Sequence, residues 1–156
     1  MTRIISTRKL QTGSMVLEAL IGILIFSLGV LAVVGLLATS TKNAGDAKYR
    51  SDASLLANQL VGQMLGSINR TTTSAQQLAA LQASFSNTKG ASYIAWSNDV
   101  AATLPGASAV PPTVVITQTA VTSNSTPSNQ AFITIRWNTP SEASGIHAYT
   151  AIAQIR

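Results

Sequence analysis

Side chains that could do chemistry are few in this sequence of 156 residues. The single histidine, His147, has no acidic residue or second imidazole near it in the sequence, so we expect no metal site there. Asp99 and Glu142 are the only acids in the second half of the chain and are too scattered to form a catalytic carboxylate pair. Ser86 and Lys89 match Ser-x-x-Lys without its companion motifs. Cysteine is absent, which excludes a thiolate site. We therefore expect no catalytic residue, no metal and no cofactor.

One acidic residue stands apart because of its surroundings. Glu18 adjoins residues 19–38, ALIGILIFSLGVLAVVGLLA, in which Ser27 is the only polar residue. As a helix this run spans about 30 Å, the thickness of a bilayer core. A carboxylate deep in such a helix costs about 2.5–3.5 kcal/mol. Glu18 is therefore expected either to pair with a cation or to lie at the headgroup level, where the positive end of the helix dipole favours it.

The charges around the apolar run indicate its orientation. Arg3, Arg8 and Lys9 precede the run without any acid, whereas the charges that follow it are mixed in sign. The positive-inside rule therefore predicts a cytoplasmic N-terminus and an exported remainder. The run is too long for an ordinary secretory signal peptide. The net charge of +5 depends largely on these three cations, so the charge pattern does not indicate nucleic-acid binding.

Gly13 lies five residues before Glu18, in TGSMVLEALIGILIF. A basic leader, this glycine, this glutamate and the apolar helix together resemble the signal of type IV prepilins. The resemblance implies a cleaved leader of residues 1–13, an N-methylated Ser14 as the first mature residue, and subunit assembly through Glu18 and the terminal amine of a neighbouring subunit. It also implies a prepilin peptidase, major and minor pilins and an inner-membrane assembly platform as partners. Ser14 departs from the family, which usually has Phe or Met there.

After residue 39, helical periodicity continues. Ala53, Leu56, Leu60, Met64 and Ile68 recur every three or four residues, which predicts an amphipathic extension of the helix to about Ile68. A second helix is expected over LAALQASF, behind a capping box formed by Ser74 and Gln77. Trp96, Val100 and Leu104 then recur at intervals of four, which favours another short helix; a strand over 93–97 is the alternative.

The last third of the chain is rich in β-branched residues. TVVITQTAV (113–121), AFITIRWN (131–138) and HAYTAIAQI (147–155) predict three antiparallel strands. In the middle strand, Ile133, Ile135 and Trp137 share the face expected to pack on the helix. The predicted fold class is α+β, a long N-terminal helix packed against a small antiparallel sheet. The predicted divisions are the leader, an anchoring and assembly half of the helix at 14–39, and a periplasmic domain at 40–156.

Within the family, the chain is similar to minor pilins of the PilV type. The similarity lies in the sequence of the apolar helix, in Trp96 followed by LPG at 104–106, and in ITIRW at 133–137. The resemblance implies a non-catalytic subunit for pilus assembly, held in the inner membrane by a single span and then incorporated into the pilus. A pseudopilin of type II secretion is the alternative within the class. An alternative of another class is a tip module that binds DNA or a surface, with the loop 122–130 as the contact and with Lys89, Arg136 or Arg156 as the DNA-binding cations. A membrane-tethered enzyme is the remaining alternative.

Overall fold

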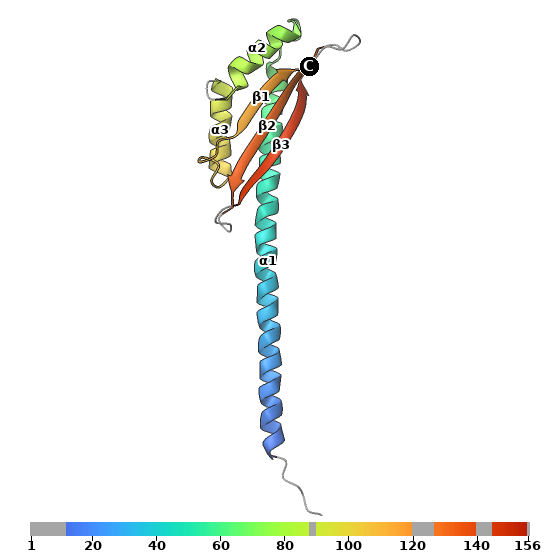
Figure 1. Ribbon diagram of the computed structural model, residues 1–156, viewed down its shortest axis with the longest axis vertical. Coiled ribbons are helices and arrows are strands. Elements are labelled where there is room, and N and C mark those ends of the chain that lie inside the picture. Colours follow the sequence, from blue (N-terminus) through green and yellow to red (C-terminus); the bar gives the residue numbers. More distant parts are fainter. Residues whose placement is uncertain (1–11, 88–89, 120–126, 140–144, 156) are drawn as a thin grey trace, which may run out of the picture. The chain divides into compact units, whose positions relative to one another are not determined.

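The computed structural model describes residues 12–87, 90–119, 127–139 and 145–155, with side chains from residue 14 onward. In chain order its elements are α1 (Thr12–Ser67), α2 (Ser74–Phe85), α3 (Ala91–Thr103), β1 (Thr113–Gln118), β2 (Asn129–Asn138) and β3 (Ile146–Ile155) (Figure 1). The chain divides into two compact units: an N-terminal unit, residues 1–43, and a head, residues 44–156. The fold is α+β, as the sequence predicts.

Within the head, the second part of α1 supplies one wall of the core. Ala53, Leu56, Leu60 and Met64 are buried at the predicted helical spacing, and Ala57 lies buried beside them. The helix ends at Ser67, one residue before the predicted end, and Ile68 packs on the core from just beyond it. The predicted amphipathic stripe is therefore confirmed.

A capping box starts α2, but one residue earlier than predicted. The Thr73 hydroxyl accepts from the Gln76 backbone N–H at 3.4 Å, and the Gln76 side chain accepts from the Thr73 backbone N–H at 3.0 Å. The prediction of Ser74 and Gln77 is wrong because Gln77 is used elsewhere: its amide donates to the carbonyl oxygens of Asn69 and Thr72 and closes the turn before the helix. Thr73 also has the extended backbone that an N-cap requires.

The segment around Trp96 is helical, so the strand alternative is wrong. In α3 the buried side chains are Tyr93, Trp96 and Val100, which lie on one face. Two polar atoms on that face find partners inside the head: the Trp96 indole Nε1 donates to the Leu56 carbonyl of α1 at 2.9 Å, and the Tyr93 hydroxyl donates to the Pro112 carbonyl at 2.6 Å. These bonds let large aromatic side chains be buried without an unsatisfied donor.

The three strands form an antiparallel sheet in the order β1-β2-β3. Burial alternates along β2, with Ile133, Ile135 and Trp137 on the buried face, which confirms the predicted orientation. The strand bounds differ from the prediction at their ends: β1 ends three residues earlier, at Gln118, β2 begins two residues earlier, at Asn129, and β3 one residue earlier, at Ile146. In Figure 1, α2 and α3 lie on the β1 side of the head and β3 forms the opposite edge of the sheet.

Candidate functional site

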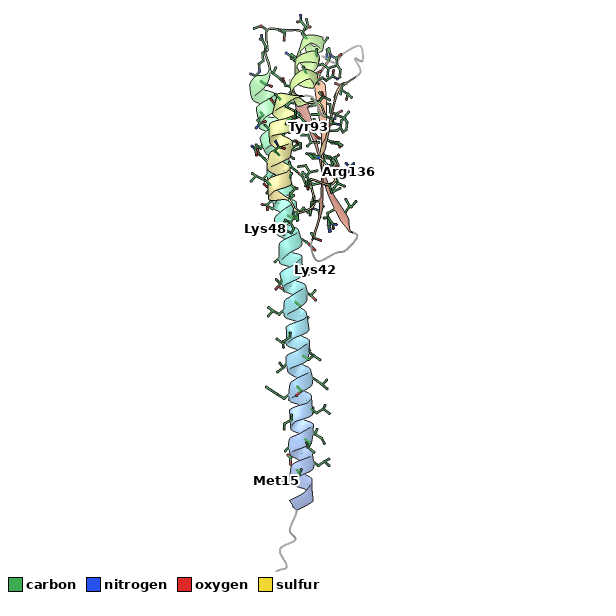
Figure 2. The ribbon with its side chains drawn as sticks, turned by 90° about the vertical axis from the view of Figure 1, so that its left-hand side faces the viewer. Met15, Lys42, Lys48, Tyr93 and Arg136 are labelled. Atoms are coloured by element: carbon green, nitrogen blue, oxygen red, sulfur yellow. The ribbon has the colours of Figure 1, made fainter. Side chains whose placement is uncertain are left out.

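The N-terminal part of α1 exposes an apolar surface all around its circumference. Every large apolar side chain from Met15 to Leu37 is exposed, between 46% for Val30 and 76% for Met15. Figure 2 shows these side chains, Met15 included, projecting on different sides of the helix. Among the described residues, this is the one helix long and apolar enough to cross a membrane, although a signal sequence has the same properties. A helix that is apolar on every side requires an apolar environment.

Two hydroxyl groups in this part of α1 have partners inside the helix. The Ser27 Oγ donates to the Ile23 carbonyl at 2.7 Å, and the Thr39 Oγ1 donates to the Gly35 carbonyl at 3.1 Å. Such bonds to the preceding turn satisfy the hydroxyl donors locally. The segment can therefore enter a hydrocarbon environment without leaving these donors unpaired.

Glu18 differs from these hydroxyl groups, because its side chain carries a charge on the apolar helix. It lies one turn after Ser14 on the same side of α1, and the two residues line a shallow groove together with Leu17 and Ile21. No Lys, Arg or His occurs in the sequence from Ser14 to Thr41. Lys42, the next cation, lies about 36 Å further along the helix axis. A counter-ion for Glu18 in an apolar environment must therefore come from the N-terminal side or from another molecule.

The predicted cleavage bond, between Gly13 and Ser14, falls in the first turn of α1, which begins at Thr12. Residues 1–11 of the predicted leader lie outside the described residues, and of Gly13 only the helical backbone is described. If cleavage frees the amine of Ser14, that amine becomes the cation nearest to Glu18 in the sequence. Ser14 and Glu18 of one chain are offset by about 6 Å along the helix axis.

In the head, one pocket combines ionisable and aromatic side chains. It is lined by Asp46, Ala47, Arg50, Trp137, His147 and Ala148. The His147 ring stacks on the Trp137 indole, with ring centroids 5.7 Å apart and an interplanar angle of 18°. The His147 Nε2 also lies 3.5 Å from the Thr139 hydroxyl. These contacts give His147 a packing role. Among the described residues, no three His, Cys, Asp or Glu side chains are grouped as a metal site would require.

The scattered acids and the residues of the alternative contact site are described only in part. Asp99 is exposed on α3, and Arg136 lies half-buried on the face of β2 opposite to Ile133. Ser128 and Asn129, at the end of the predicted contact loop, are buried, and β2 already begins at Asn129, so this part of the loop prediction is wrong. The structure does not describe Lys89, Glu142, Arg156 or the part of the predicted contact loop at 122–126.

Comparison of this chain with protein-family models, curated proteins and solved structures finds no match. The architecture, a long helix with an apolar start packed by its second part against a three-stranded antiparallel sheet, is consistent with a pilin-like fold. A functional assignment therefore depends on the residues themselves.

Proposed function

We propose that this chain is a minor pilin, a non-catalytic structural subunit that takes part in the assembly of a type IV pilus. The observation that carries the proposal is Glu18. It is a single carboxylate at the start of a helix segment whose apolar side chains are exposed on every side, and residues 14–41 supply no cation to pair with it. A charge buried in that position is stabilised by a partner from outside the segment.

The freed amine of a neighbouring subunit fits this requirement. In this proposal a prepilin peptidase cuts after Gly13, and Ser14 becomes the methylated first residue of the mature chain. A methylated amine remains protonated near neutral pH, so it supplies the missing cation. Pairing with Glu18 offsets part of the desolvation cost of both charges. It also fixes the axial position of one subunit against the next.

The proposed location follows from the distribution of charge. Arg3, Arg8 and Lys9 hold the N-terminus in the cytoplasm, residues 14–39 form the anchor in the inner membrane, and the domain at 40–156 faces the periplasm before incorporation. The proposed partners are the prepilin peptidase, the assembly platform of the inner membrane, and other major and minor pilins. The absence of cysteine favours a minor subunit, because many major pilins close a C-terminal loop with a disulfide.

The test of this proposal is leader processing. Replacing Gly13 with valine, whose side chain is larger and branched, should leave a full-length precursor in membranes on an immunoblot, whereas the native chain becomes shorter. Gly22→Val is the matched control: it introduces the same side chain into the same helix at a position with open space around it, and it should be processed normally. A native chain that never becomes shorter would contradict the proposal.

A further inference from the structure

The turn between α1 and α2 contains a sequence pattern that the proposed assembly role does not use. Asn69, Arg70 and Thr71 form Asn-x-Thr with a middle residue other than proline, which is the acceptor pattern for N-linked glycosylation. All three residues are exposed. Acceptor asparagines lie in surface loops of exported proteins, and this turn of the head has the exposure that such a site requires.

Thr71 holds the side chain of Asn69 in one orientation. The Thr71 backbone N–H and the Thr71 hydroxyl both donate to the Asn69 Oδ1, at 3.0 and 2.6 Å. Because a backbone N–H can only donate, the atom that faces Thr71 is the carbonyl oxygen, and the amide nitrogen Nδ2 lies on the other side of the carboxamide. No described group accepts a hydrogen bond from Nδ2, so this nitrogen is accessible for reaction.

Other bonds fix the backbone of the turn. The Asn69 carbonyl accepts from the Thr72 hydroxyl at 2.8 Å and from the Gln77 side chain at 3.1 Å. These bonds close the turn without using the Asn69 side chain. A group attached at Nδ2 therefore breaks no hydrogen bond within the described part of the head.

A groove beside Asn69 has a lining that suits a neutral sugar. Its volume is about 290 Å³, and none of the described residues that line it is charged. Hydroxyl and amide side chains line it together with apolar ones, among them Ser67, Thr72, Gln76, Ser84, Ile68 and Leu81. Gln76 uses only its side-chain oxygen in the capping box, so its amide N–H groups are available to the hydroxyl groups of a sugar.

We propose that Asn69 is an N-glycosylation site, at which a glycosyltransferase of the cell attaches a neutral sugar to Nδ2. The donor is a sugar that carries a phosphate leaving group on its carbon C1. The Nδ2–C1 bond forms, the bond between C1 and the phosphate oxygen breaks with its electron pair on the phosphate, and a base of the transferase takes one Nδ2 proton. The two hydrogen bonds from Thr71 stabilise the negative charge that shifts to Oδ1 as this proton leaves. The proposal is independent of leader cleavage and of incorporation into a fibre.

The test is the mass of the peptide that contains Asn69, prepared from protein isolated from the cells that make it. We expect this peptide to be heavier by one or more neutral sugar residues, with fragment masses that place the addition on Asn69. Thr71→Val keeps a branched side chain but removes the hydroxyl, so the addition should be lost, whereas Thr71→Ser should retain it. Thr72→Val is the matched control: it removes the neighbouring hydroxyl, which bonds to the Asn69 backbone, and it should retain the addition.

Four results would overturn the proposal. They are an unmodified Asn69 in the native protein, an addition on Asn69 that persists in Thr71→Val, equal loss in Thr71→Val and Thr72→Val, and an addition confined to Asn124. Asn124 begins a second Asn-x-Thr pattern, at 124–126, which lies outside the described residues. Fragment masses distinguish the two asparagines.

One further variant identifies the source of the sugar, which is either a nucleotide-linked donor in the cytoplasm or a lipid-linked donor on the exported face of the membrane. The full-length double variant Val30→Arg, Val33→Arg should stay in the cytoplasm, because arginine is unfavourable in the middle of a membrane helix. An addition on Asn69 of this variant identifies the nucleotide-linked donor. An unmodified variant beside a modified native chain identifies the lipid-linked donor.

Discussion

The replacement Glu18→Gln tests the proposed assembly role of the one charge in the apolar segment. The amide has nearly the same size as the carboxylate, so the exposed apolar surface around it is unchanged. In a fibre built as proposed, the variant leaves a neighbour's terminal ammonium without its counter-ion. Removing one partner of a buried ion pair costs about 3–5 kcal/mol. Glu18 lies close to the start of the apolar run, so we expect the lower end of this range. At about 1.4 kcal/mol per tenfold change, incorporation should fall by roughly 100-fold.

The assay compares sheared fibres with cell membranes by quantitative immunoblot. The variant should be processed and retained in the membrane at least as well as the native chain, because removal of the charge lowers the cost of membrane insertion by up to about 2.5–3.5 kcal/mol. Asp99→Asn is the control, since it removes one exposed negative charge from the head and should leave incorporation unchanged. Native levels of processed Glu18→Gln in fibres would refute the ion-pair reasoning.

Two further predictions concern the stability of the head. Gly90→Ala should lower the free energy of unfolding by about 1–3 kcal/mol, because an added Cβ would overlap the Ser84 carbonyl; Gly62→Ala, in open space on α1, should raise it by about 0.5–1 kcal/mol. Denaturant titration in detergent measures both, and equal effects of the two substitutions would contradict the packing before α3. Burial raises the pKa of the Tyr93 hydroxyl above its ordinary value of 10.0. The unfolded chain then loses this proton first, so the contribution of Tyr93 to stability should be constant below about pH 10 and fall above it. Tyr93→Phe should remove part of that fall, and an unchanged pH profile would count against the buried hydroxyl.

Much of the fold could be predicted because its periodicities are clear. The stripe from Ala53 to Met64 has helical spacing and the alternation around Ile133 has strand spacing, and each has a single face that can be buried. The capping box was ambiguous, because Thr73 with Gln76 and Ser74 with Gln77 both satisfy its pattern. The choice depends on the contact of Gln77 with the preceding turn, which sequence spacing does not reveal.

Features that depend on strand order could not be read from the sequence. The stack of His147 on Trp137 requires the register between β2 and β3, because the two residues belong to different strands. The position of β3 at the border of the described sheet likewise depends on the strand order. The roles of Gly13, Ser14 and Glu18 stay predictions for another reason: each involves a second molecule, either a peptidase or a neighbouring subunit.

The most direct test of the account is the mass of the N-terminal peptide from protein isolated from cells. We expect the peptide to begin at Ser14, to carry one added methyl group and to retain Glu18 unmodified. A peptide that still begins at Met1, or one that begins at any residue other than Ser14, would contradict the claim that the carboxylate on the apolar helix awaits a freed terminal amine.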